Sequence, residues 1–261
     1  MKHYSIFHPL YMSFFSKSLY RDVAGNWKGL CFTYLLIVLA LSIAPDMVRL
    51  HARVTDFIVE EAPKVVSQVP TITISEGQAS IKEPVPYTIN APWSKQPFAV
   101  IDTSDRPPAM ENIKATVILT KTKLAVRGDA SDLRSLDLAR LHNLVIDGNL
   151  ISRWLEVFKD YFIFAVYIFA LFFAFLYYLV QVMLCASIGM LFSRMFNLEL
   201  SARALIRLSV IAFTPPILLQ TAHAVLEVEF PFGSVITFVL ATCYLYFAVG
   251  SCSEKTVSRT V

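Results

Sequence analysis

The sequence predicts an α+β membrane protein, with four transmembrane helices and a small extracytoplasmic antiparallel β domain. Composition is the first observation: 56% of the 261 residues are hydrophobic and 16% are charged, whereas soluble domains have about 45–50% apolar and about 25% charged residues. Distribution is the second: residues 46–160 hold 14 basic and 15 acidic residues, 29 of the 43 charged residues in the chain. The apolar excess therefore lies outside this segment. The formal net charge of +3 does not indicate nucleic-acid binding.

Four segments are apolar enough to cross a bilayer, which requires about 20 mostly apolar residues for about 30 Å of hydrocarbon. The predicted transmembrane helices are residues 27–48, the apolar part of a long helix over 149–193, residues 205–226 and residues 230–250. A cleaved signal peptide is the alternative for the first, because Ser42, Ile43 and Ala44 resemble a cleavage site. The long preceding region and Pro45 disfavour cleavage, so an uncleaved helix is expected.

The distribution of charge predicts the orientation, because short loops rich in lysine and arginine stay in the cytoplasm. Basic residues outnumber acidic ones in the N-terminal segment (1–26), in the loop over 194–204 and in the tail over 251–261. The segment between the last two spans contains Glu227 and Glu229 and no basic residue. Both termini are therefore expected in the cytoplasm, and residues 49–148 are expected outside it.

Residues 49–148 are expected to form the extracytoplasmic α+β domain. Residues 46–69 are expected to be helical, as a continuation of the preceding helix that Pro63 stops or bends. Alternating polar and apolar residues then predict strands, with a turn at Glu76 and Gly77 and a hairpin around residues 121–123. Prolines at positions 84, 86, 92 and 97 confine the neighbouring segments to short or edge strands. One sheet of four to six antiparallel strands is expected, without disulfides, because all four cysteines lie in or beside the spans.

One further helix is predicted at the N-terminus, and the long helix that contains the second span is expected to extend beyond the membrane. Residues 1–26 contain an amphipathic stripe, with Ile6, Leu10 and Phe14 on one face, which indicates a short helix in the cytoplasmic interface of the membrane. Residues 149–193 contain no helix breaker, and a helix from Asn149 to Phe192 has a length of about 66 Å. This length exceeds the hydrocarbon core, so the outer end of the helix is expected to project beyond the membrane.

The third span contains a candidate solute site or helix kink. Pro215 and Pro216 remove two backbone donors inside an apolar helix, and Thr214 precedes them. Broken helices of this kind occur at transport sites. A purely structural kink is the alternative, with Thr214 or a neighbouring helix satisfying the freed carbonyls.

Among the histidines, His223 has the sequence neighbours that best fit a site for a proton or a cation. It lies near the outer end of the third span, with Gln220 three residues before it and Glu227 four residues after it. Such a helical face can bind a proton or a cation; a helix end that meets headgroups and water is the alternative. The sequence contains no phosphate-binding glycine loop, nucleophile motif or Cys/His cluster. No catalytic residue, cofactor or metal ligand is therefore expected.

Five residues are candidates for contacts with lipid phosphates or with the membrane interface, because they are basic or aromatic and flank the spans on the cytoplasmic side. They are Arg21, Trp27, Lys28, Arg203 and Arg207. The spacing of Glu199 from Arg203 also fits a pair of opposite charges within one helix, and the two interpretations are compatible.

Several motifs occur along nearly the whole chain: SLYRDV (18–23) with NWKG (26–29), PVPYTI (84–89), VIDT (100–103), LTKTKL (119–124), and RLSV (207–210) with TPP (214–216). Together they resemble a family of bacterial membrane proteins, domain-of-unknown-function family 1189. The resemblance implies a multi-pass protein of the bacterial cytoplasmic (inner) membrane, with four spans and an extracytoplasmic domain. It implies no activity, substrate or catalytic residue.

These observations predict a non-enzymatic sensor, scaffold or accessory subunit whose extracytoplasmic β domain binds a ligand or a partner. Membrane lipids and either an envelope protein or a second copy of the chain are the expected partners, and nucleic acid is not. The alternative is a small-solute transporter or channel subunit that uses the Pro-kinked third span. A membrane enzyme is disfavoured, because no nucleophile and base are paired in the sequence.

Overall fold

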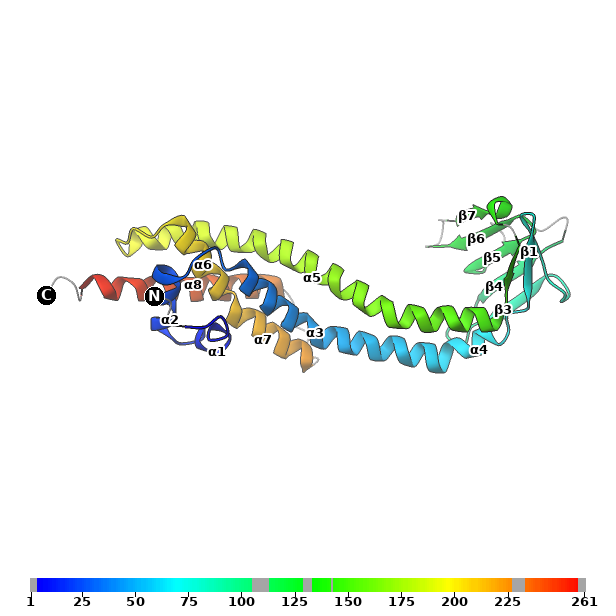
Figure 1. Cartoon of the computed structure of the whole chain (residues 1–261), viewed down its shortest axis with the longest axis horizontal. Coiled ribbons are helices and arrows are strands. Elements are labelled where there is room, and N and C mark those ends of the chain that lie inside the picture. Colours follow the sequence, from blue (N-terminus) through cyan, green and yellow to red (C-terminus); the bar gives the residue numbers. More distant parts are fainter. Residues whose placement is uncertain (1–3, 105–112, 129–132, 142, 227–232, 258–261) are drawn as a thin grey trace. The chain divides into compact units, whose positions relative to one another are not determined.

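The computed structural model describes residues 4–104, 113–128, 133–141, 143–226 and 233–257 (Figure 1). The chain divides into two compact units: residues 1–50 and 163–261 form a helical unit, and residues 51–162 form a β unit. Helices α3 (Phe32–Asp56) and α5 (Gly148–Met195) each contribute to both units. Each unit has its own hydrophobic core.

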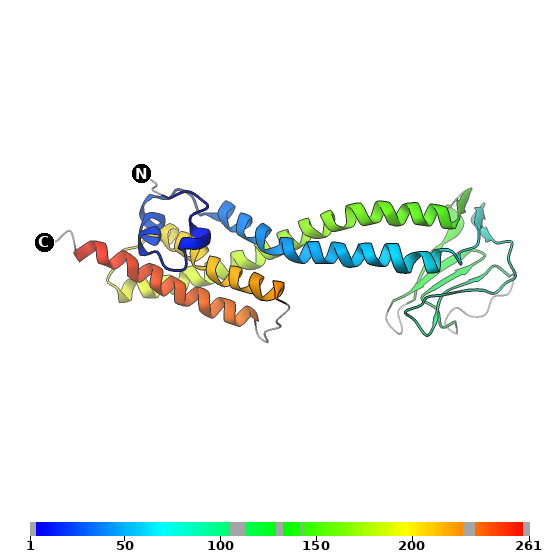
Figure 2. The same cartoon turned by 90° about the horizontal axis from the view of Figure 1, so that it is seen from below.

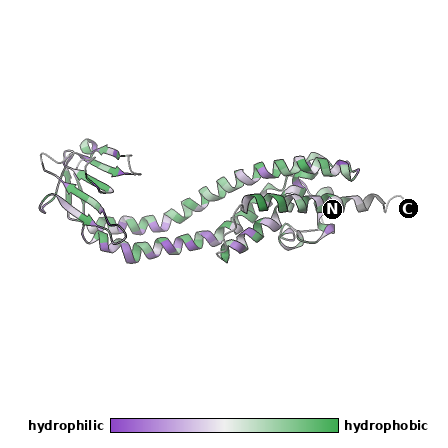
Figure 3. Ribbon diagram, turned by 180° about the vertical axis from the view of Figure 1, so that it is seen from behind, coloured by the Kyte–Doolittle hydropathy of each residue, from purple (hydrophilic) through white to green (hydrophobic). Residues whose placement is uncertain are grey.

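Among the described residues, four helical segments are long and apolar enough to cross a membrane: Phe32–Val66, Gly148–Met195, Ala202–Val225 and Gly233–Ser253. They coincide in number and order with the four predicted spans, as expected of a multi-pass membrane protein. Hydrophobic residues dominate the helical unit, whereas hydrophilic residues are frequent in the parts of α3 and α5 that belong to the β unit (Figure 3).

The third of these segments consists of two helices, α6 (Ala202–Ala212) and α7 (Thr214–Val225), which meet at Phe213. Pro215 and Pro216 lie in the first turn of α7, where the amide hydrogens that proline lacks would have no partner within the helix. The prolines therefore lie at the start of α7, directly after the interruption at Phe213, whose backbone is itself helical. Helix α7 packs beside α8 (Gly233–Val257), as both views show (Figure 2).

The amphipathic N-terminal stripe, expected as one helix, is divided between α1 (Pro9–Met12) and α2 (Lys17–Asn26). The division occurs at Ser16, whose side chain accepts a hydrogen bond of 3.3 Å from the Leu19 amide and so caps α2. The apolar face of α2 is buried, with Leu19, Tyr20 and Val23 fully inaccessible. It packs against α6 and α8.

The helical part of the β unit ends at Val66, three residues before the expected limit at residue 69. Helix α3 is followed by the π-helical turn η1 (Phe57–Glu61) and by α4 (Ala62–Val66). Pro45 lies within α3, and Pro63 lies in the first turn of α4. Pro63 therefore does not stop the helical segment, which changes from a π-helical turn to an α-helix at this point.

The described residues of the β unit form eight strands in two sheets. The three-stranded sheet has the order β2-β1-β8, with β1 (Ile72–Ser75), β2 (Gln78–Ser80) and β8 (Leu144–Ile146). The five-stranded sheet has the order β3-β4-β5-β6-β7, with β3 (Tyr87–Asn90), β4 (Pro97–Asp102), β5 (Val117–Thr120), β6 (Lys123–Arg127) and β7 (Leu133–Asp137). A short 3-10 helix, η3 (Leu138–Arg140), follows β7.

The turn and the hairpin of this unit agree with the sequence patterns, whereas the number of sheets differs from the single sheet that was expected. Glu76 and Gly77, both with positive φ, form the turn between β1 and β2. Strands β5 and β6 form the expected hairpin. The single antiparallel sheet is wrong in two respects, because there are two sheets and because β4 pairs with β5 in parallel. Parallel strands need a long connection between them. The alternation of residues within one strand does not predict with which other strand it pairs.

Candidate functional site

An apolar cavity of about 200 Å³ lies inside the β unit. Its walls come from both sheets, from α4 and from η3, and all fifteen side chains that line it are apolar. They include Ile72 and Ile74 of β1, Ala99 and Ile101 of β4, and Leu119 of β5.

The strand period explains why these residues face inward. Along β1, Ile72 and Ile74 are buried while Thr73 and Ser75 are not, as the two-residue repeat of a strand requires. Ala99 and Ile101 repeat the pattern on β4. Ala99 carries only a methyl group where its neighbours carry branched chains, which leaves room in the space between the sheets.

A second cavity, of about 180 Å³, lies in the helical unit between α3, α5 and α7; this cavity is named the polar cleft. Its polar lining comprises Ser42 and Asp46 of α3, Tyr178 of α5, and Gln220 and Thr221 of α7. The Tyr178 hydroxyl donates a hydrogen bond of 3.2 Å to Oε1 of Gln220. As far as the described residues show, no basic side chain lines it.

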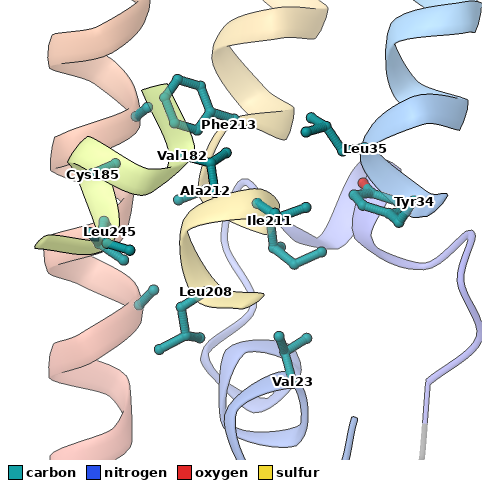
Figure 4. Close-up of a cluster of buried hydrophobic side chains, with 14 of the residues drawn as sticks. Val23, Tyr34, Leu35, Val182, Cys185, Leu208, Ile211, Ala212, Phe213 and Leu245 are labelled. Atoms are coloured by element: carbon teal, nitrogen blue, oxygen red, sulfur yellow. The ribbon is translucent and has the colours of Figure 1, made fainter. Parts of the chain in front are cut away.

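The junction of α6 and α7 is buried in the core of the helical unit (Figure 4). Phe213 is fully inaccessible, and Thr214 and both prolines are buried with it. The hydroxyls of Tyr34 and Thr214 are 2.9 Å apart and form a hydrogen bond. The first turn of α7 is therefore fastened to α3.

His223 is not at this junction. It lies nine residues beyond Thr214, in the last turn of α7, and is half-buried. Glu227, its expected partner, lies outside the described residues. The Arg49 guanidinium of α3 donates to the carbonyls of Ala224 and Val225 at the end of α7, the second at 2.5 Å. This places a cation at the negative end of the α7 dipole.

Three of the five candidate lipid contacts are directed into the protein. Nε of Arg21 donates to the Ser251 carbonyl at 2.6 Å, and Nη2 of Arg207 donates to the Ala24 carbonyl at 2.7 Å. The Trp27 indole donates to the carboxylate of Asp22 at 2.9 Å. Lys28 and Arg203, by contrast, are exposed.

Asp22 and Tyr20 complete this N-terminal cluster. Asp22 is 5% exposed and also accepts a hydrogen bond of 2.7 Å from the Asn26 amide. Burial raises the pKa of the Tyr20 phenol well above its ordinary value. Tyr20 therefore stays protonated and donates to the Ser13 carbonyl at 2.6 Å. The SLYRDV and NWKG motifs thus build a folded cap on α6 and α8.

The residues that line the two cavities were not identified as a site from the sequence. Gln220 was considered only as a neighbour of His223, and Asp46 only as part of a charge count. The available signal for Asp46 is that it is the first charged residue after an uncharged run. Nothing in the sequence indicated that Tyr178 would meet Gln220, forty-two residues away.

Within the described residues, no group of three His, Cys, Asp or Glu side chains is placed to hold a metal ion. A family model described as Protein of unknown function (DUF1189) matches residues 7–249. This match confirms the family resemblance of the motifs. No curated protein and no solved structure matches the chain.

Proposed function

The chain belongs to the DUF1189 family of proteins of unknown function, and we propose that it is a membrane-anchored binding protein whose β unit holds an apolar ligand. It resides in the bacterial inner membrane with both termini in the cytoplasm, so that the β unit is extracytoplasmic. It acts as a sensor, scaffold or accessory subunit and not as an enzyme.

The apolar cavity of the β unit carries this proposal. Its volume of about 200 Å³ exceeds that of an engineered apolar cavity of about 150 Å³ that stays dry and binds benzene. Water gains little in such a space, because the lining offers it no hydrogen-bond partner. Each methylene group that enters contributes about 0.8 kcal/mol, so the cavity suits a short hydrocarbon chain.

The lining also supports binding without conversion. A nucleophile, acid or base must reach the reacting atoms within hydrogen-bond distance. None of the fifteen lining side chains can act in that way, because all are aliphatic or phenyl groups. A ligand held there would be recognised by its shape and its lack of polarity.

Photo-crosslinking with peptide mapping tests the proposal, using full-length protein in lipid nanodiscs and an alkyl diazirine of six to eight carbons. Labels are expected on strands β1, β4 and β5. Ala99→Leu fills part of the cavity and should reduce this labelling several-fold. Val145→Leu is the matched control, because Val145 is 52% exposed. Equal labelling in Ala99→Leu and wild type, or labels only outside the cavity, would contradict the proposal.

The transporter alternative is favoured by one observation, the presence of the polar cleft beside α7. A transporter needs a path for the solute through the spans, whereas a binding protein does not. Substitution of Pro215, Pro216 and His223, one at a time, should then abolish solute flux in reconstituted vesicles. Undiminished flux in all three variants would exclude this route.

A further inference from the structure

The polar cleft of the helical unit is not used by the apolar binding function, and its chemistry is different. It lies between three helices that are apolar enough to span a membrane. Its lining nevertheless contains a carboxylate, an amide and three hydroxyls, from Asp46, Gln220, Ser42, Tyr178 and Thr221. Ionisable groups inside a membrane are costly, and those that persist are generally functional.

The position of Asp46 along α3 indicates how deep its carboxylate lies in the membrane. Helix α3 begins at Phe32, and Asp46 follows fourteen residues later, at about 21 Å along the axis. A hydrocarbon core is about 30 Å thick. Measured from Phe32, Asp46 lies within the apolar layer, and in the span expected over residues 27–48 it lies at the outer edge of that layer. At either depth a carboxylate gains from a partner. Asp46 is exposed on its helix, and none of the side-chain hydrogen bonds or ion pairs found among the described residues involves its carboxylate.

The hydrogen bonds of the lining leave the cleft rich in acceptors. Ser42 donates its hydroxyl hydrogen to the Leu39 carbonyl at 3.0 Å, and Thr221 donates to the Ile217 carbonyl at 2.9 Å. Each hydroxyl hydrogen is thus used within its own helix, and the oxygen lone pairs remain as acceptors.

Gln220 is held by two hydroxyls. Its Oε1 accepts from Tyr178 at 3.2 Å and from Thr237 of α8 at 3.4 Å. The Tyr178 hydrogen is therefore also used, and its oxygen becomes another acceptor. Together with the Asp46 carboxylate, the cleft offers four acceptor groups against the single amide NH₂ of Gln220.

We propose that the polar cleft binds the primary ammonium group of an amine. An ammonium carries three N–H donors and a positive charge, so it matches both the acceptors and the carboxylate. A volume of about 180 Å³ accommodates a head of two carbons, as in ethylamine or ethanolamine. The group comes either from a free amine or from the headgroup of phosphatidylethanolamine.

Arg49 connects two of the helices that line the cleft, α3 and α7. It lies one helical turn beyond Asp46, and its guanidinium binds the last carbonyls of α7. This contact ties α3 to α7 and so holds Asp46 opposite Gln220 and Thr221. The guanidinium is engaged by these carbonyls, which leaves the Asp46 carboxylate for the ligand.

Thermal unfolding of the full chain tests the free-amine source. The protein is placed in nanodiscs of phosphatidylglycerol alone, and ethylamine is titrated at constant ionic strength. Wild type should gain stability with rising ethylamine. Asp46→Asn should raise the apparent Kd by about tenfold or more, since a charge-assisted hydrogen bond is lost. Asp56→Asn, on the same helix but outside the cleft, is the control and should behave like wild type.

Native mass spectrometry tests the lipid source, after reconstitution with an equal mixture of phosphatidylethanolamine and phosphatidylglycerol. Retention of phosphatidylethanolamine by wild type but not by Asp46→Asn identifies the lipid, and stabilisation by ethylamine alone identifies a free amine. Ser42→Ala removes an acceptor without touching the charge and should weaken the same binding. The proposal is overturned if wild type responds to neither source, or if Asp46→Asn and Asp56→Asn respond alike. Neither result bears on the apolar cavity of the β unit.

Discussion

The guanidinium of Arg21 donates a hydrogen bond of 2.6 Å to the backbone carbonyl of Ser251, which lies 230 positions later in the chain. Arg21 belongs to α2 and Ser251 to α8, so this contact fastens the N-terminal helix to the last span. Arg207 of α6 makes the equivalent contact with the Ala24 carbonyl of α2. Helix α2 is thereby held by both helices against which its apolar face packs.

Replacement of Arg21 by methionine keeps the apolar stem of the side chain and removes the donor. The free energy of unfolding should fall by about 1.5–3 kcal/mol, the usual contribution of a hydrogen bond to a charged group. Unfolding in mixed detergent micelles with increasing dodecyl sulfate measures it. Arg203→Met is the matched control, because Arg203 is exposed, and should change stability by less than about 0.5 kcal/mol. Equal loss in both variants would show that Arg21 acts only through its charge.

The hydrogen bond between Tyr34 and Thr214 predicts coupling between α3 and the start of α7. Tyr34→Phe and Thr214→Val each remove one hydroxyl, and the double variant removes both. A double-mutant cycle should give a coupling energy of about 0.6 kcal/mol, the average between transmembrane helices, and at most about 1.7 kcal/mol. Additive effects of the two substitutions would mean that the hydroxyls, although 2.9 Å apart, contribute independently.

Gly77 is a position where a side chain should destabilise the β unit. Its φ is +75°, and a Cβ atom built there would lie 2.7 Å from Cα of Ala139. Gly77→Ala is therefore expected to cost about 1–3 kcal/mol, from the left-handed backbone and from the overlap. Hydrogen exchange of the β1 and β2 amides measures the loss. Gly25→Ala, with no heavy atom within 4 Å, should leave this exchange unchanged.

The proposed orientation predicts the behaviour of reporter fusions. A periplasmic reporter fused after Ile101 should be active, and a cytoplasmic reporter fused there should not. A fusion after Asn197 should show the reverse, because the loop over 194–204 is basic. The opposite pattern at both positions would invert the assignment of the β unit to the extracytoplasmic side.

The features that could be predicted from the sequence are those that depend on neighbouring residues. Four apolar runs are sufficient to predict four membrane-length helices, because transfer into hydrocarbon depends on the composition of each segment. Glu76 and Gly77 predict a turn for the same local reason. The division of the N-terminal stripe at Ser16 was not predicted, although the serine cap that accompanies it is also a local feature.

Features that depend on distant residues could not be obtained in this way. The parallel pairing of β4 with β5, the second sheet and the space beside Ala99 all require knowledge of which strands meet. Arg21, Trp27 and Arg207 illustrate the same limit. Their types and positions beside the spans fit lipid contacts, but each binds a carbonyl or carboxylate of the protein itself.

The polar cleft shows the difference most directly. Asp46, Tyr178 and Gln220 lie on three helices that are far apart in the sequence, and hydropathy describes each helix separately. Their proximity arises from the tertiary arrangement of α3, α5 and α7, whose side chains meet at the cleft from distant parts of the sequence. Local composition decides whether a segment is a membrane helix, whereas the packing energy between helices decides which of its polar groups share a cavity.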